Sequence, residues 1–529
     1  MKSQIAKEIR SGNVSLGIEL GSTRIKAVLI DSKNVSIAQG DFEWENKLVD
    51  GYWTYSLIEI WNGISVCYTN LKRQVKSEYD VNLTNIKNIG ISAMMHGYIV
   101  LDENDELLVP FRTWRNTNQE QASTFLSELY NYPMPQRFSN AHIYQAILNQ
   151  EEHVNQITHQ TTLAGYIHYR LTGEKVLGVG EASGMFPIDL NTKDFNQDFI
   201  QKFNDVVHKK GITWDYQDLL PKVLVAGENA GVLTEEGAKL LDPSGDLQPG
   251  SNLCPPEGDA GTGMVATNSV AKKTGNVSAG TSVFAMIVLE DDLKAVHPEI
   301  DLVTTPSGNL VGMVHCNNCT SNLNSWINLF DQVTELFGIE VSKNELYTKL
   351  FKKALESDKD AGGLLSYEYL SGEHITGFEE GRPLFVMNAD SNFNLANFMR
   401  CGLYSSLGAL KIGLDILLKE EQVKLEKIYG HGGFFKTEEV GQRIMSQATN
   451  SPVSIMDNAG EGGAWGIAIL ASYQDSSKTL DDYLNEEVFH GSYETTIMAT
   501  EEEINGFEMF MSRYQQGLAI ERAAVDNLK

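Results

Sequence analysis

The stretches LGIELGSTRIKAVLID (residues 16–31) and KTGNVSAGTSVFAMIVL (residues 273–289) decide the fold of this chain. In both, apolar residues flank a short turn of glycine with serine or threonine, which is typical of a β-hairpin whose tip is open to a ligand. Because the pattern occurs twice, we predict two domains of related topology. Each should contain a mixed five-stranded sheet with helices on both faces.

The length of 529 residues exceeds the usual size of a single core, which also favours two domains. Strand-like segments alternate with helix-like ones, so we expect the α/β class. We place the border near residue 268, where MVATNSVAKK leaves a helical pattern. The predicted domains are residues 1–268 and 269–529. Helical periodicity predicts helices near residues 119–129, 160–171, 397–418, 438–448 and 462–473.

The charge balance restricts the partners of the chain. Lysine and arginine number 42 and aspartate and glutamate 70, which gives a net charge of −28. Such a surface repels nucleic acid and anionic lipid, so we expect neither a nucleic acid nor a membrane partner. A nucleotide can still bind where backbone amides, Mg²⁺ and a helix N-terminus supply positive potential.

The amino-terminal sequence and the cysteines indicate a cytoplasmic protein. No signal-peptide core precedes Val14, and no segment reaches 18 uninterrupted apolar residues. The five cysteines are too few and too scattered for a disulfide framework, so we expect reduced thiols. Cys316 and Cys319 form a Cys-x-x-Cys pair without further ligands nearby, and we interpret the spacing as coincidence.

Each hairpin tip is a candidate phosphate site. In the first, backbone amides and hydroxyls at Gly21, Ser22 and Thr23 could contact a phosphate, while the Glu19 carboxylate could hold Mg²⁺ through water. In the second, Gly280, Thr281 and Ser282 occupy the same position. Taken singly, each is equally well explained as an ordinary surface hairpin, because glycine turns are common.

Two such tips in separate domains resemble the actin, hexokinase and Hsp70 ATPase group, in which two ribonuclease H-like domains enclose a central cleft. Motifs in order along the chain make it resemble the FGGY carbohydrate kinases in particular. Besides the hairpins, they are SAMMHGYIVLD and FRTWRN, HYRLTGE, EASGMFPID, PEGDAGTGMV, GGLLSYEYLSGEH and the glycine-rich segment that begins GHGGFFK at residue 430.

The resemblance implies ATP-dependent phosphorylation of a small sugar, with ATP and Mg²⁺ as cofactors and the sugar as substrate. It implies that Asp259, within PEGDAGTGMV, is the general base that accepts the proton of the attacking hydroxyl. An aspartate at a glycine turn before an apolar stretch would also serve as a helix cap. Whether the chain forms a homodimer is left open.

The sugar site implied by the resemblance contains Met95, His96, Trp114 and Asn116 together with Asp259. Without the resemblance, a methionine and a histidine after an apolar strand are better explained as core residues. The nucleotide site implied by it contains Gly432, Gly433 and Phe434, with the phenylalanine covering the base. The glycines Gly460, Gly462 and Gly463 could line the same pocket.

Two departures from the family pattern affect the expected substrate. Glu19 stands where the family usually has aspartate, and Asn116 stands where it usually has a second aspartate. A pentulose such as xylulose or ribulose is the leading acceptor, and another ketose, a polyol or a sugar acid stays open. A sensor without catalysis is the second class of function, and an ATPase acting on proteins is disfavoured because the sugar-kinase segments are present.

Overall fold

A computed structural model describes residues 2–456 and 462–528, and it divides into two compact units. The first unit comprises Met1–Val270, Leu302–Val311 and Glu461–Gly491, and the second Ala271–Asp301, Gly312–Gly460 and Ser492–Lys529. The first border lies close to the predicted residue 268. The expected contiguous ranges need correction, however, because two later segments of the chain return to the first unit.

The elements up to residue 270 are α1 (Lys2–Ser11), β1 (Ser15–Leu20), β2 (Arg24–Ile30), β3 (Ser36–Glu43), β4 (Lys47–Val49), β5 (Tyr52–Thr54), α2 (Leu57–Tyr79), β6 (Asn88–Ala93), β7 (Ile99–Leu101), α3 (Glu120–Tyr130), α4 (Ser139–Leu148), β8 (His159–Thr161), α5 (Leu163–Thr172), β9 (Val176–Gly178), α6 (Val179–Ser183), β10 (Ile188–Asp189), β11 (Asp194–Phe195), α7 (Gln197–His208), α8 (Tyr216–Leu219), β12 (Lys222–Leu224), α9 (Glu235–Leu241), β13 (Asn252–Leu253), β14 (Glu257–Gly258) and α10 (Asp259–Ala266).

The later elements are β15 (Thr274–Ala279), β16 (Val283–Val288), β17 (Asp301–Thr304), β18 (Leu310–Cys316), α11 (Ser321–Leu336), α12 (Lys343–Lys353), β19 (Leu365–Tyr367), β20 (Leu384–Val386), α13 (Leu395–Ser405), α14 (Gly408–Asp415), β21 (Lys427–His431), α15 (Val440–Thr449), β22 (Val453–Met456), α16 (Gly462–Tyr473), α17 (Leu480–Tyr483), β23 (Glu494–Ile497) and α18 (Glu501–Asn527). The predicted helix near 397–418 is thus two helices, α13 and α14.

The sheet of the first unit has the order β13-β6-β1-β2-β3, with β14 also paired to β6. Strand β1 runs antiparallel to β2 and parallel to β6. Because β1 occupies one edge of β6 along its whole length, β13 and β14 share the other edge. The mixed sheet therefore has six strands in five positions, where five strands were expected.

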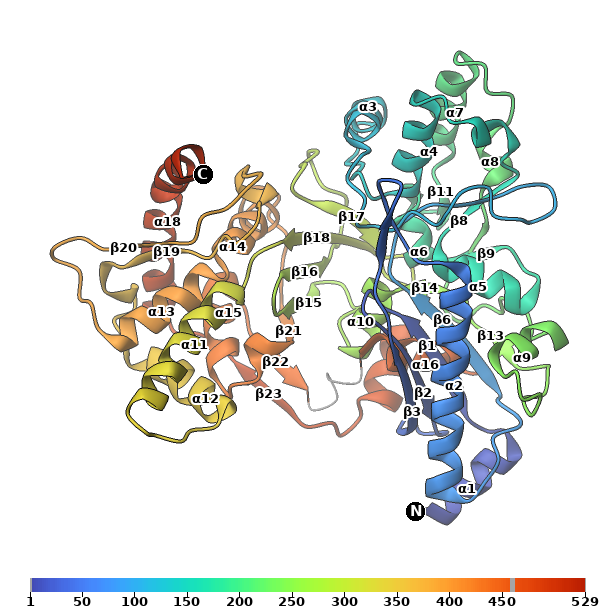
Figure 1. Ribbon diagram of the computed structural model, residues 1–529, viewed down its shortest axis with the longest axis horizontal. Helices are drawn as coiled ribbons and strands as arrows, with labels where there is room; N and C mark the ends of the chain where they lie inside the picture. Colours follow the sequence, from blue (N-terminus) through green and yellow to red (C-terminus); the bar gives the residue numbers. More distant parts are fainter. Residues whose placement is uncertain (1, 457–461, 529) are drawn as a thin grey trace. The chain divides into compact units, whose positions relative to one another are not determined.

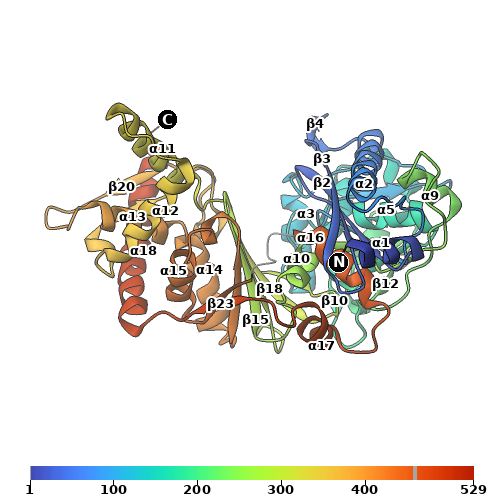
Figure 2. The same ribbon diagram turned by 90° about the horizontal axis from the view of Figure 1, so that it is seen from below.

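Helices cover both faces of this sheet, as predicted. Side chains alternate along β1, so its odd positions face one side and its even positions the other. The odd face packs against α16 so closely that a Cβ on Gly17 would lie 2.0 Å from the carbonyl oxygen of Ala464. The even positions belong to a core shared with α2 and α5. Figures 1 and 2 show α2 and α5 on one side of the strands and α10 and α16 on the other.

Both predicted hairpins are present. Leu20 pairs with Ile25 across the first turn, which leaves residues 21–24 at the tip. Ala279 pairs with Val283 across the second, which leaves residues 280–282. The second hairpin belongs to a sheet of the order β17-β18-β16-β15-β21-β22-β23, so this sheet has seven strands rather than the expected five.

Within the part of the chain that the structure describes, no helix alone has both the length and the apolar character needed to cross a membrane. Only a bent pair, Leu395–Ser405 with Gly408–Glu420, meets that criterion by length and composition.

Candidate active site

The carboxyl end of β6 and the start of α10 bring the predicted base into contact with the predicted sugar strand. Asp259 is the first residue of α10, and its Oδ1 accepts a hydrogen bond from the backbone N–H of Met95 at 3.2 Å. The N-cap of α10 is Gly258, so Asp259 is not the cap residue. Desolvation raises the pKa of Asp259. A carboxylate with a raised pKa is a better proton acceptor at neutral pH than an ordinary aspartate.

Glu19 lies on β1 beside the N-terminus of α16. Its Oε2 accepts a hydrogen bond from the Ala464 N–H at 3.2 Å, and a Cβ on Gly463 would lie 2.3 Å from its Oε1. Burial, with the charge of Asp259 as a second cause, raises the pKa of Glu19 to about 7. The two carboxylates therefore act on one another electrostatically within the first unit.

Gly463 lies in the first unit against β1, while residues 432–434 belong to the second unit, and their grouping in one nucleotide pocket stays a prediction. Gly462 begins α16 in the same unit, while Gly460 lies outside the described residues. The glycines of α16 allow close helix packing: a Cβ on Gly466 would meet the Thr262 carbonyl oxygen at 2.1 Å.

Two further carboxylates flank Asp259 and had no predicted role. Glu257 accepts hydrogen bonds from the Glu181 N–H at 2.9 Å and the Gly180 N–H at 3.3 Å. Burial raises the pKa of Glu257 to about 8. Burial also raises the pKa of Glu181 well above its usual value, and neither of its oxygens accepts a hydrogen bond of ordinary geometry from the described residues. The only sequence signal for Glu257 was its place in the motif of Asp259.

Met95 and His96, which follow β6, are fixed in position by contacts with other parts of the protein. The Nδ1 of His96 lies 2.9 Å from the Gly184 carbonyl oxygen, and its Nε2 accepts a hydrogen bond from the Nε–H of Arg137. These partners fix the neutral tautomer, and burial lowers the pKa of His96 well below its usual value. Met95 is buried and packs beside Gly258. Contact of His96 with a sugar therefore stays a prediction, and both ring nitrogens already have protein partners.

The tip of the first hairpin is fixed by aromatic side chains. The indole N–H of Trp114 donates to Ser22 Oγ at 3.1 Å, that of Trp44 donates to the Gly21 carbonyl, and the Tyr55 hydroxyl donates to the Ser22 carbonyl. Trp114, predicted for the sugar site, is thus in contact with Ser22, predicted for the nucleotide site. Trp114 as a whole residue is 36% exposed, so a ligand can still reach it.

The side chain of Asn116 is hydrogen-bonded to the backbone of β5. Its Oδ1 accepts from the Trp53 N–H at 2.8 Å, and its Nδ2 donates to the carbonyls of Trp53 at 3.0 Å and Thr113 at 2.9 Å. The side chain is buried, and both amide protons and the amide oxygen are used. An amide can donate and accept in this position, whereas a carboxylate can only accept. This geometry explains the asparagine and argues against direct contact with a sugar.

In the second unit, the glycine turn after β21 lies against the second hairpin. Gly432 has a φ of +95°, and a Cβ there would lie 2.4 Å from the Ala279 carbonyl oxygen at the end of β15. A Cβ on Gly433 would have no neighbouring atom within 4 Å. Phe434 is 1% exposed and packs edge-on against Phe435. Its burial argues against the predicted cover for an adenine ring, while the glycines stay candidates for the nucleotide site.

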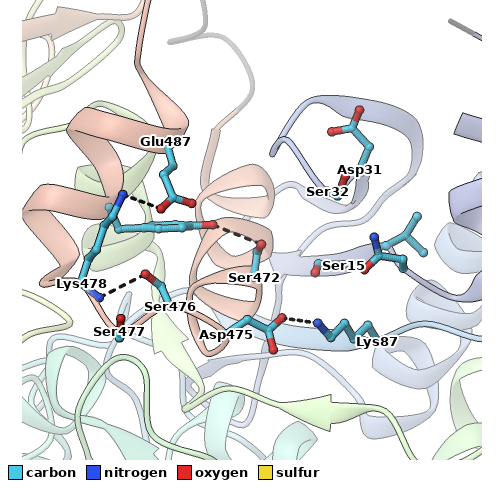
Figure 3. A pocket seen from close by; sticks show the side chains of 13 residues that line it. Ser15, Asp31, Ser32, Lys87, Ser472, Asp475, Ser476, Ser477, Lys478 and Glu487 are labelled. Carbon is cyan, nitrogen blue, oxygen red and sulfur yellow. Dashed lines mark hydrogen bonds and ion pairs between the residues drawn. The ribbon is translucent and has the colours of Figure 1, made fainter. Parts of the chain in front are cut away.

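A polar pocket of 390 Å³ lies at the opposite end of β1 from Glu19. Figure 3 shows two ion pairs among its residues, Lys87 with Asp475 at 2.9 Å and Lys478 with Glu487 at 2.7 Å. The pocket therefore contributes no group to the carboxylate site.

No three His, Cys, Asp or Glu side chains are arranged to hold a metal ion in the described ranges 2–456 and 462–528. The pair formed by Glu19 and Asp259 nevertheless fits Mg²⁺, because a hard cation would neutralise two carboxylates that repel each other. Mg²⁺ commonly takes one or two protein carboxylates and completes its shell with water and phosphate oxygens.

Comparison with known proteins agrees with this architecture. Family models for the N-terminal and C-terminal domains of the FGGY carbohydrate kinases match residues 14–243 and 275–474. A xylulose kinase of Haemophilus influenzae is 22% identical over 94% of this chain and 98% of its own length.

Solved structures share the fold at low identity. A ligand-bound xylulose kinase from Lactobacillus acidophilus superposes with a TM-score of 0.77 at 17% identity, over 97% of this chain and 98% of that one. Plasmodium falciparum glycerol kinase with ADP superposes with a TM-score of 0.74 at 16% identity, over 96% of this chain and 98% of that one.

The two hairpin-bearing sheets and the matching domains define a carbohydrate kinase with the actin and hexokinase type of ATPase fold, a phosphotransferase. The chain belongs to the FGGY family of carbohydrate kinases.

Proposed function

We propose that the protein transfers the γ-phosphoryl group of MgATP to a hydroxyl of a pentulose such as xylulose or ribulose. The observation that carries the proposal is the position of Asp259, at the start of a helix and hydrogen-bonded to the backbone of Met95. The match of relatives named xylulose kinase over nearly the whole chain supports the acceptor class.

Asp259 acts as the general base. Its carboxylate accepts the proton of the attacking hydroxyl as the new bond to phosphorus forms and the bond from phosphorus to the leaving oxygen breaks. The Met95 N–H holds one carboxylate oxygen, which fixes the orientation of the group before the substrate arrives. The raised pKa of Asp259 adjusts its basicity towards neutral pH.

Glu19 would hold Mg²⁺, directly or through water, and the tips of the two hairpins would hold the phosphates through Ser22, Thr23, Thr281 and Ser282 and their backbone amides. MgATP supplies the electrophilic phosphorus when bound. The ADP present in the structure of glycerol kinase supports a nucleotide for this chain as well.

A different acceptor is the second candidate, because Asn116 is occupied by the backbone of Trp53. If this position contributes no carboxylate to sugar recognition, another ketose, a polyol or a sugar acid could be preferred. Among the solved structures of this fold are both a xylulose kinase and a glycerol kinase, so the fold does not decide the acceptor.

The test is an ADP-release assay with MgATP and a panel of ketoses, polyols and sugar acids, with product identified by mass spectrometry. We expect acceptor-dependent ADP release with at least one pentulose and a mass gain of one phosphoryl group. Release with a polyol or sugar acid alone would support the second candidate. No acceptor-dependent release across the panel, from protein that still binds MgADP, would support a sensor instead.

A further inference from the structure

The tip of the second hairpin is held by the loop that leads into α11. The Cys319 N–H donates to the Thr281 carbonyl at 3.0 Å, and the Thr320 N–H and hydroxyl donate to the Gly280 carbonyl at 3.0 and 2.7 Å. The carbonyl oxygens of Gly280 and Thr281 thus point into this loop.

These contacts also determine the direction of two amide protons. In a trans peptide the C=O and the N–H point in opposite directions. The N–H groups of Thr281 and Ser282, which share peptide units with the bonded carbonyls, are therefore directed away from the loop. Successive N–H groups with a common direction form an anion-binding concavity.

The loop is held in turn by Asn318, which lies directly before Cys319. The Asn318 side chain accepts from the N–H of Leu370 at 3.0 Å and of Ser371 at 3.1 Å. Its amide protons point towards the carbonyls of Ser371 and Gly372 at 3.2 and 3.3 Å. The turn at residues 370–373 therefore surrounds this one side chain.

Glu373, the last residue of this turn, also binds Asn318. Its Oε2 accepts from both the backbone N–H and the Nδ2 of Asn318 at 3.2 Å. Glu373 is completely buried, and its own backbone is paired with Phe378 in both directions. A buried glutamate with no other function is costly, because burial disfavours the carboxylate. The two hydrogen bonds to Asn318 instead indicate that Glu373 stabilises the loop that leads into α11.

We propose that Glu373 and Asn318 are positioning residues for the nucleotide: through residues 319–320 they fix the tip at residues 280–282 so that its amide protons face the ATP phosphates. The inference rests on the proposed function, since it takes the second hairpin as a phosphate site. It assigns a role to residues 370–373, the LSGE segment of the motif GGLLSYEYLSGEH. It also gives the Cys-x-x-Cys spacing a structural explanation, because Cys316 and Cys319 are the buried ends of the supporting loop.

The test compares Glu373→Gln and Glu373→Ala with wild type by calorimetric titration of MgADP. We expect Glu373→Ala to raise the Kd for MgADP roughly tenfold, because both hydrogen bonds from Asn318 to Oε2 are lost, and Glu373→Gln to raise it less, because one oxygen stays as acceptor. The KM for ATP should rise in parallel, while the KM for the best acceptor of the panel stays unchanged. A general loss of structure would change both.

Glu521→Gln is the matched control. Glu521 is also buried and accepts a backbone N–H, that of Arg382 at 2.7 Å, but it lies on α18 and does not contact the loop. Its replacement should leave the Kd for MgADP unchanged. Hydrogen exchange resolved by peptide should be faster at residues 279–283 and 317–321 in Glu373→Gln than in Glu521→Gln.

The outcomes separate the two proposals. A wild-type protein that does not bind MgADP overturns the proposed function and this inference together. Normal binding by wild type, with the same Kd and the same exchange in Glu373→Gln, Glu373→Ala and Glu521→Gln, overturns this inference alone.

Discussion

The backbone N–H of Met95 donates a hydrogen bond to Oδ1 of Asp259, 164 positions further along the chain. This contact joins the end of β6 to the start of α10. It holds the carboxylate against the segment where the family resemblance implies the sugar, so a backbone group, and not another side chain, orients the proposed base.

Asp259→Asn should remove most phosphorylation while substrate binding persists. The amide keeps an oxygen for the Met95 N–H but cannot accept the proton of the hydroxyl, and loss of a general base typically costs roughly 10² to 10⁴ in rate. The measurement is kcat for the best acceptor, with thermal unfolding and the Kd for MgADP as controls for folding. A well-folded variant with nearly normal kcat would show that the base is another group.

Glu19→Gln should raise the Mg²⁺ concentration needed for half-maximal turnover. The amide keeps an acceptor for the Ala464 N–H but removes the charge that attracts the cation. The KM for the acceptor should stay near that of wild type, because the role that we propose for Glu19 is on the metal and not on the acceptor. Titration of turnover with Mg²⁺ at saturating ATP measures the effect, and an unchanged titration curve would exclude a metal role for Glu19.

Asn116→Asp should destabilise the fold. The new carboxylate oxygen would face the carbonyls of Trp53 and Thr113 without a proton to donate, which costs on the order of 2 kcal/mol or more for a buried group. Urea unfolding measures the loss. Asn229→Asp is the control, since this exposed side chain only accepts the Gly231 N–H, which aspartate can also do. Unchanged stability with an altered acceptor preference would return Asn116 to the sugar site.

Glu257→Gln should change how stability depends on pH. The folded pKa of about 8 exceeds the value of 4.5 for a free glutamate, so the folded state binds more protons between these pH values. Stability from this group is complete below the unfolded pKa and is lost as pH rises through the folded pKa. The wild-type Tm should therefore fall from pH 5 to 8, and the variant should show a smaller fall.

Other buried glutamates, including Glu181, also make the stability fall as the pH rises, so Glu257→Gln removes only part of this pH dependence. Because a pKa of about 8 keeps Glu257 mostly protonated at pH 7, kcat at that pH should change little in Glu257→Gln. An identical Tm profile in wild type and Glu257→Gln would contradict the raised pKa of Glu257.

Local sequence patterns predicted the helices and strands better than they predicted which of these elements pack against one another. The glycine turns gave both hairpin tips, and the run of small residues correctly predicted helix α16. Small residues show that a helix packs closely, but they carry no information on which strand it packs against. The partner of α16 is β1, more than 400 positions earlier, and its assignment to the C-terminal domain was wrong.

The same limit applies to single polar residues of the site. Asn116 was predicted as a substitute for a sugar-binding carboxylate because its partner, the backbone of Trp53, is not visible in a linear pattern. The burial that raises the pKa of Glu257 depends on glycines 178 and 180, which come from another part of the chain. Such environments depend on tertiary contacts and could not be predicted from spacing.

The return of residues 461–491 to the first unit has a consequence for biosynthesis. The odd-numbered face of β1 stays uncovered on the ribosome until α16 has been made, after almost the whole second unit. The N-terminal half therefore cannot reach its final packing as a separate nascent domain, and it must wait for a helix that is translated only after most of the second unit.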